Sequence, residues 1–406
     1  MNTPKIRFKG FTDDWEQRKV GDQMYIKSRI GWQALTKQEY LSEGDYYLIT
    51  GTDIDETTHR VDLKRSYYVS KERYEMDSKI QVKEGDIIVT KDGTIGKVAM
   101  VTGLDKPATL NSHLFVLRDM SGKLDNHFLL HILNSHMFNH FVKSTKTGST
   151  LTGLPQKTFV EFAFSCPKYE EQKLLSNYFD RLDHLIALHQ RKCDETKQLK
   201  KFMLQKMFPK NGEKNPKIRF EGFTDDWEQR KLGDVLKERT ERAKGEEELL
   251  SVTIANGVIR QADSEKRNIA SEDKRNYKVV KKGDIPYNSM RMWQGAVGNS
   301  QYDGIVSPAY TILVPTDEAN DKFFMELFKK ENSLQRFKRW SQGLTSDTWN
   351  LKYPALSTMQ FFIPSIKEQK RIANCLQELD YLITLHQRKC EKRKALKKFM
   401  LQNMFI

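Results

Sequence analysis

The chain has 406 residues, of which 38% are hydrophobic and 30% charged, so it is long enough for two or three cores and too apolar for a disordered protein. No apolar run of about eighteen residues argues for a membrane span, and MNTPKIRF lacks the apolar core of a signal peptide. The four cysteines form no C-x-x-C pair, so we expect a reduced, cytoplasmic protein.

The net charge of +14 is concentrated in two short segments. Residues 188–210 hold seven basic and two acidic side chains, and residues 386–406 hold seven basic and one acidic. Because Lys and Arg displace counterions from phosphate, a polyanionic partner is one interpretation of these segments. A solvated helical face is the other, and the charge alone does not choose between them.

A long internal repeat runs through the chain. The segment PKIRFKGFTDDWEQRK at 4–19 returns at 216–231 with one substitution. LHQRKC at 188–193 returns unchanged at 385–390, and KFMLQKMF returns as KFMLQNMF. Each half therefore has a nearly identical head and tail around a divergent middle. One fixed scaffold that carries two interchangeable modules with different specificities explains this pattern.

The head of each half contains the signals of a short helix. Asp13 followed by Glu16 predicts a capping box, and Gly21 predicts the end of that helix. Phe8 and Trp15 are expected to anchor the head to its domain by packing.

The divergent middles mix short strands with helices. Residues 84–101 predict two strands around a turn at 91–94, and residues 282–298 occupy the corresponding place in the second half. Apolar spacing predicts a helix over 126–143 and another over 322–340. A polar loop follows each helix, STKTGSTLTG in the first half and SQGLTSDTWN in the second.

The tails predict two long helices. Ser365 is the expected N-cap of the second, with Glu368 at its third position, whereas the first copy has Lys168 in the capping place and relies on Glu170 and Glu171. Apolar residues then recur at heptad-like spacing over roughly forty residues, or about 60 Å. We expect the two helices to pair antiparallel about a pseudo-two-fold axis and to hold the two modules apart.

Motifs for catalysis and metal binding are incomplete. GTIGKV, which begins at Gly93, lacks the first glycine and the hydroxyl of a phosphate-binding loop. SPAY at Ser307 lacks the amide and second proline of an amino-methyltransferase motif, and the EQK segments have no suitably placed aspartate for a nuclease. His127 and His131 share a helical face, but His140 lies elsewhere on the helix. We expect no catalytic residue and no metal ligand in this chain.

The heads PKIRFxGFTDDWEQRK and the tail IPSIKEQKRIANCLQELDYLITLHQRK resemble the specificity subunit of type I restriction–modification systems. The resemblance covers essentially all of the chain, and only CPKYEEQKLL in the first copy departs from the usual start of the tail. It implies a mixed α/β (α+β) fold, with target recognition domains at 1–165 and 213–363 and conserved spacer helices at 166–212 and 364–406.

The resemblance also implies a function for each part. Each recognition domain would read one half of a split, non-palindromic site in double-stranded DNA, and the helices would dock two methylation subunits. Restriction subunits would join them in the full complex. The chain itself would bind no cofactor and contact no membrane, because S-adenosylmethionine, ATP and Mg²⁺ are expected on the partner subunits, which methylate adenine or restrict DNA.

The polar loops supply the side chains that DNA contacts require. Arg and Lys suit guanine edges, and Asn and Gln suit adenine. Two other classes stay open: a methyltransferase or nuclease with unrecognised motifs, and a coiled-coil protein adaptor. The residues expected to contact DNA are Lys91, Thr94, Lys97, Lys143, Lys146 and Ser149 in the first domain, and Asn288, Arg291, Gln294, Ser346 and Asn350 in the second.

Overall fold

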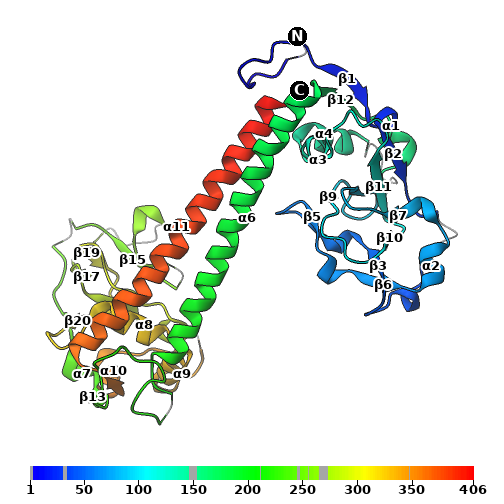
Figure 1. Cartoon of the computed structure of the whole chain (residues 1–406). Coiled ribbons are helices and arrows are strands. Elements are labelled where there is room, and N and C mark those ends of the chain that lie inside the picture. Colours follow the sequence, from blue (N-terminus) through cyan, green and yellow to red (C-terminus); the bar gives the residue numbers. More distant parts are fainter. Residues whose placement is uncertain are drawn as a thin grey trace. The chain divides into compact units, whose positions relative to one another are not determined.

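The structure is a computed structural model with two compact units. The described residues are 3–30, 34–145, 153–210, 212–244, 247–254, 256–264, 273–346 and 348–406. The first unit contains Met1–Lys192 and Leu385–Ile406, and the second contains Cys193–Thr384. The boundary falls inside both long helices, α6 (Tyr169–Lys206) and α11 (Ile366–Met404), which are green and orange-red in Figure 1. Each unit therefore combines one divergent middle with a stretch of both helices.

The first unit is built on two mixed sheets. Among the described residues, one sheet has the order β2 (Met24–Lys27), β11 (Leu114–Asp119), β8 (Ile87–Thr90), β9 (Val98–Met100), β5 (Arg60–Val61) and β4 (Ile54–Asp55). The other has the order β6 (Tyr67–Val69), β3 (Tyr46–Ile49), β10 (Ala108–Leu110) and β7 (Gln81–Val82). The helices of this middle are α1 (Val20–Gln23), α2 (Lys71–Glu75), α3 (Asn126–Leu133), α4 (His136–Ser144) and α5 (Gln156–Phe159).

The sheet that contains β8 is buried on both faces, because side chains alternate along a strand. Ile87 and Val89 face a core shared with α3, α4 and the long helices, whereas Ile88 faces a core shared with the other sheet. All four residues of β8 are buried, which explains its continuous apolar sequence. The turn that follows β8 is therefore held on a rigid strand.

The second unit has smaller sheets. A sheet of the order β14 (Leu236–Glu238), β20 (Tyr310–Pro315) and β18 (Ile285–Asn288) accompanies the pairs β15 (Leu250–Thr253) with β16 (Gly257–Arg260) and β17 (Lys278–Val280) with β19 (Gly304–Val306). Its helices are α7 (Leu232–Val235), α8 (Asp321–Lys329), α9 (Glu331–Trp340) and α10 (Tyr353–Thr358). The main core packs β18 and β20 against α8, α9 and the long helices.

The head of each half forms a strand, so the predicted Asp13-capped helix is wrong. β1 (Glu16–Lys19) pairs antiparallel with β12 (Ala163–Cys166), and β13 (Glu228–Lys231) pairs in the same way with β21 (Gln360–Ile363). These ladders join the start of a middle to its end, and this tertiary pairing overrides the local capping signal. The predicted packing role of the tryptophan is confirmed, since Trp15 and Trp227 are each 2% exposed.

The glycine of each head does not end a helix but permits a close contact inside a short one. A Cβ atom on Gly21 would lie 2.7 Å from the Cβ atom of Val160, and one on Gly233 would lie 2.8 Å from that of Ser357. Both glycines therefore let α1 and α7 approach the segment just before β12 and β21.

The predicted helix of each middle is interrupted. Over 126–143 the chain forms α3 and α4, separated at Asn134 and Ser135, and over 322–340 it forms α8 and α9, separated at Lys330. Asn134 and Lys330 leave the helical conformation, so the apolar pattern was right but the single helix was wrong. The two strands around the 91–94 turn are confirmed as β8 and β9.

The long helices are confirmed. α6 has 38 residues and α11 has 39, and the Ser365 hydroxyl accepts a hydrogen bond from the backbone N–H of Glu368 at 3.4 Å. Within the part of the chain that the structure describes, no helix is long and apolar enough to cross a membrane.

Candidate nucleic-acid interface

A buried ion pair fastens each repeated head to the start of a long helix. The Arg7 guanidinium donates to both carboxylate oxygens of Glu171 at 2.7 and 2.8 Å, and Arg219 donates to Glu368 at the same two distances. Both glutamate side chains are 1% exposed. Because this bidentate pairing satisfies a buried charge, it fixes the orientation of head and helix. The glutamate of each EQK segment thus has a structural partner in the head.

The glutamine of each EQK segment holds the middle through backbone atoms. Gln172 accepts a hydrogen bond from the backbone N–H of Asp125 at 2.8 Å, and Gln369 accepts one from Asn320 at 2.9 Å. Each amide also donates to backbone carbonyls of the tail and of the middle. Asp125 and Asn320 are the N-caps of α3 and α8, so these bonds position both helices.

The two long helices are antiparallel within each unit, and equivalent ion pairs join them. In the first unit the Lys397 ammonium lies 2.5 Å from an Asp183 carboxylate oxygen, and in the second Lys200 lies 2.7 Å from Asp380. The two pairs are equivalent, because Asp183 corresponds to Asp380 and Lys200 to Lys397 at the 197-residue offset of the tails. The helical seam therefore carries the same polar contact in both units.

The LHQRKC segments meet in the first unit. The Nδ1 atoms of His189 and His386 are 3.0 Å apart, so one neutral ring donates to the other. Burial, followed by nearby cations, lowers the pKa of both imidazoles and favours this neutral pair. Cys193 and Cys390 are 2% and 4% exposed, which fits small core residues.

The histidines of α3 contact the long helix α6. His127 and His131 contact the two carboxylate oxygens of Asp180 on α6, at 2.5 and 3.0 Å. Burial raises the pKa of Asp180, but the hydrogen bonds from both histidines outweigh it and leave this pKa below its usual range. No group of three or more metal-ligating side chains occurs among the described residues. These histidines position α3 on the long helix.

Two loops of the first unit meet where β8 ends. The turn at 91–97 joins β8 to β9, and its Lys91 carbonyl accepts a hydrogen bond at 2.6 Å from the N–H of Leu154, which follows the polar loop after α4. Gly96 of the same turn packs against Val142 of α4. The turn, the end of α4 and the end of the polar loop therefore form one surface.

The second unit repeats this arrangement with different side chains. The Ser289 carbonyl after β18 accepts a hydrogen bond at 2.8 Å from Leu351, which follows the polar loop after α9. Gly295 packs against Leu334 of α9, as Gly96 packs against α4. The two bonds correspond at offsets of 197 and 198 residues, so each unit builds the same loop pair on the same strand.

In the first unit, two of the residues expected to contact DNA are engaged within the protein. The Lys91 ammonium donates to the Ser28 hydroxyl at 3.3 Å, and Lys97 forms an ion pair with Glu56. Each ammonium has three N–H donors, so these partners leave donors for a phosphate.

Of the other expected residues of the first unit, two are exposed and two lie outside the described residues. Thr94, in the turn, and Lys143, near the end of α4, are exposed. Lys146 and Ser149 lie outside the described residues.

In the second unit, the expected residues cluster on the two loops. Arg291 donates to the Gln294 side chain at 3.2 Å, and the Asn288 side chain accepts from a backbone N–H of the same turn. Ser346 is exposed in the polar loop. The side-chain oxygen of Asn350 is buried and has no hydrogen-bond partner among the described residues.

An aromatic cluster in the second unit was missed by the sequence reasoning. Trp293 and Trp349 lie with ring centroids 5.2 Å apart, and the Lys338 ammonium lies 5.9 and 5.4 Å from these centroids. The rings join the turn after β18 to the polar loop. The available signal was a tryptophan in the predicted polar loop, Trp349, and another in the segment 282–298.

Comparison with known proteins identifies the family. Residues 12–198 and 224–393 match the family of the type I restriction modification DNA specificity domain. The chain belongs to this family. The two matched segments cover both halves, so the predicted family resemblance and the two-domain mixed fold are confirmed.

Named relatives of this specificity-domain chain agree with the assignment. It is 26% identical to the type I restriction enzyme MjaVIII specificity subunit of Methanocaldococcus jannaschii, over 96% of this chain and 91% of that one. It is 23% identical to the putative type I restriction enzyme MjaX specificity subunit of the same organism, over 98% and 95%. The crystal structure of the type I restriction–modification S subunit from M. genitalium shares the fold, with a TM-score of 0.62, 14% identity and coverage of 100% and 99%.

Membership of the family decides between the classes left open by the sequence. The chain is a noncatalytic specificity subunit of a type I restriction–modification system, and the prediction that it is not itself an enzyme follows from the family. The unrecognised-enzyme and adaptor alternatives are set aside.

Proposed function

We propose that each unit of this specificity subunit reads one half of a bipartite, asymmetric DNA site through its pair of loops. The observation that carries the proposal is the equivalent loop pair, fastened by Leu154 to Lys91 in one unit and by Leu351 to Ser289 in the other. The same backbone hydrogen bond joins the two loops in each unit, but the side chains of these loops differ between the units. Two equal frames with unequal reading surfaces suit a site whose halves have different sequences.

The recognised site would direct two methylation subunits to adenine, and restriction subunits would add cleavage. In this proposal the long helices are the docking surface for the methylation subunits. S-adenosylmethionine, ATP and Mg²⁺ belong to the partners, which carry the chemistry. The exchangeable recognition domains are residues 1–165 and 213–363, separated by spacer helices at 166–212 and 364–406.

A base-resolution map of methylated adenines tests the proposal. Host DNA is compared with and without this gene while the methylation subunit is expressed. Loss of a gapped, asymmetric motif on deletion is expected, and replacement of residues 1–165 by those of another specificity subunit should change one half of that motif. An unchanged map after deletion would contradict the recognition role.

A further inference from the structure

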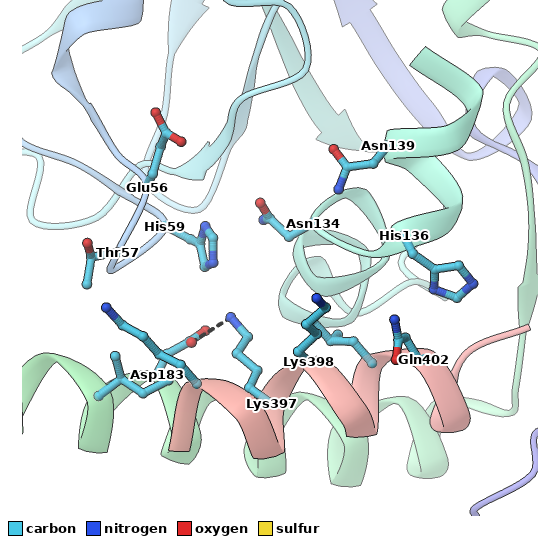
Figure 2. A pocket seen from close by; sticks show the side chains of 13 residues that line it. Glu56, Thr57, His59, Asn134, His136, Asn139, Asp183, Lys397, Lys398 and Gln402 are labelled. Carbon is cyan, nitrogen blue, oxygen red and sulfur yellow. Dashed lines mark hydrogen bonds and ion pairs between the residues drawn. The ribbon is translucent and has the colours of Figure 1, made fainter. Parts of the chain in front are cut away.

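The first unit has a cavity of about 430 Å³ where the recognition domain meets the long helices (Figure 2). The turn between β4 and β5 supplies His59, the C-terminal end of α3 supplies Asn134, and the first turn of α4 supplies Asn139. The helix α11 supplies lysines and Gln402. These side chains lie outside the pair of loops proposed to read DNA. The cavity is thus a candidate site of its own.

The charges of this cavity do not balance. The Lys397 ammonium and the Asp183 carboxylate neutralise each other, as the dashed line in Figure 2 marks. Glu56 also lines the cavity, and its carboxylate forms an ion pair with Lys97. Lys394 and Lys398 line the cavity as well, are exposed, and have no carboxylate partner among the described residues. An anion that enters would therefore meet two uncompensated ammonium groups.

His59 adds a strained polar group. Its φ is 52°, and it is the one described non-glycine residue with positive φ. A side chain in this conformation is uncommon and is often associated with function. Burial, aided by the charge of Lys397, lowers the pKa of His59 to about 3, so the ring is neutral and carries one N–H donor. Figure 2 shows the Lys397 and Lys398 side chains extending from α11 toward the His59 ring and the Asn134 amide, which lie across from that helix.

The second unit has a counterpart of this cavity, about 860 Å³ in volume. Lys201, Leu204 and Gln205 line it, and these residues correspond to Lys398, Leu401 and Gln402 at the 197-residue offset. The recurrence is independent of the divergent middles, because the shared residues all come from the repeated KFMLQ segment.

The second cavity also holds basic groups in excess. Five lysines and two glutamates line it, which leaves a net positive charge: Lys201, Lys206, Lys210, Lys329, Lys330, Glu326 and Glu331. Burial lowers the pKa of Lys330 to about 8, which reflects an ammonium removed from water without the counter-charge of an ion pair among the described residues. A bound anion would supply that charge.

We propose that each cavity binds a phosphate group, with the repeated Lys–Gln pair, Lys398 and Gln402 or Lys201 and Gln205, as the shared donors. Ammonium and amide N–H groups line both cavities, the His59 imidazole adds a donor in the first, and a phosphate accepts several such hydrogen bonds at once. Each cavity has room for more than a phosphate, so the group belongs to a larger ester. The phosphate has two possible sources, the DNA backbone and a free phosphorylated ligand. The first of these rests on the proposed function.

The first measurement uses the full chain and inorganic phosphate. Thermal unfolding is followed in phosphate and in chloride at equal ionic strength, because a ligand that binds the folded state raises the unfolding temperature. We expect phosphate to stabilise the natural chain and the double variant Lys201→Ala, Lys398→Ala to lose this stabilisation. The matched control is Lys173→Ala, Lys370→Ala, which removes two exposed lysines at the same offset on the same helices, outside both cavities.

The second measurement uses the complex with the methylation subunits. The slope of log K against log salt is recorded for DNA that carries the recognised motif. Loss of two backbone contacts should lower the magnitude of the slope by roughly 1.8, about 0.9 for each contact, while the motif in the methylation map stays unchanged. The control pair should leave the slope as it is.

The outcomes distinguish DNA from a free ligand as the source of the phosphate. They also distinguish failure of the phosphate site from failure of the proposed function. A reduced slope in the cavity variant assigns the phosphate to DNA. An unchanged slope with lost phosphate stabilisation assigns it to a free ligand. If the cavity variant matches the control in both measurements, the phosphate site is overturned. Failure of the proposed function would instead show as a deletion that leaves the methylation map unchanged.

Discussion

The repeated frame and the divergent middles use different kinds of contact. In the frame, Arg7 with Glu171 and Arg219 with Glu368 form the same buried ion pair to within the quoted distances. In the middles, the corresponding turn contains Lys91 and Lys97 in one unit and Arg291 and Gln294 in the other. The same contact therefore stabilises the frame inside each unit. The side chains on the surface proposed to contact DNA differ between the units.

The two units also differ in their titratable side chains. All nine histidines fall within the first unit, including the His189–His386 pair and the strained His59. The charged side chains of the second unit are carboxylates, lysines and arginines. The two frames are thus alike at neutral pH and should differ in acid.

The largest expected effect comes from breaking one frame. Arg7→Ala leaves the Glu171 charge buried and unpaired, and this should lower the free energy of unfolding of the first unit by about 3–5 kcal/mol. Arg219→Ala should do the same to the second unit. Urea unfolding with hydrogen exchange, which locates the weakened unit, measures both. Lys168→Ala, which removes an exposed partner of Asp13, is the control and should change little; equal losses in Arg7→Ala and this control would contradict the role of the pair.

Next in size is the effect on sequence reading. Arg291→Ala should weaken discrimination at one half-site by about 1–3 kcal/mol and leave the other half-site unchanged, because the residue lies in one unit only. Competition binding by the assembled complex, with each half-site mutated in turn, measures this. Lys282→Ala, an exposed change near the opposite end of β18, is the control. Relaxation of both half-sites, or of neither, would remove Arg291 from the reading surface.

Acid should distinguish the units. The reference pKa of His59 is 6.5 and burial lowers it to about 3 in the folded chain, so the unfolded state binds the proton first. This contribution to stability is complete above pH 6.5 and is lost as pH falls towards 3. It amounts to as much as about 2 kcal/mol between pH 7 and pH 5.

The groups that surround His59 set the direction of this change. The charges of Lys397, His131 and Arg60 lower its pKa, and that of Asp55 raises it. His59→Asn keeps a residue that tolerates positive φ and removes the titration, so it should reduce the acid loss of the first unit. Hydrogen exchange at pH 7 and pH 5 follows both units; a loss shared equally by the second unit would contradict the assignment.

The smallest effect concerns the one cap that differs between the tails. Ser365→Ala removes the hydroxyl that accepts from Glu368 at 3.4 Å, and the length of this bond places the expected loss near 0.5–1 kcal/mol. The midpoint of urea unfolding should fall slightly. Thr384→Ala, within α11, is the control for a lost hydroxyl, and an equal change in both variants would argue against a capping role.

The sequence predicted the parts that depend on local pattern or on repetition. The long helices, the strands around 91–94 and the buried tryptophans follow from spacing and composition. The head strand could not be predicted, because its ladder joins Glu16 to Cys166, far along the chain. For the same reason the meeting of Lys91 with Leu154 was not visible. The domain boundaries and the individual DNA contacts stay predictions.

The glutamine contacts of the frame bear on how such a chain can evolve. Gln172 and Gln369 form hydrogen bonds with backbone N–H and carbonyl groups of the middles, which every amino acid except proline possesses in the same form. A recombination event that replaces a middle therefore needs to conserve the course of the backbone at these points and no particular side chain. New specificities can be acquired by exchange of whole segments, with the surrounding frame inherited unchanged.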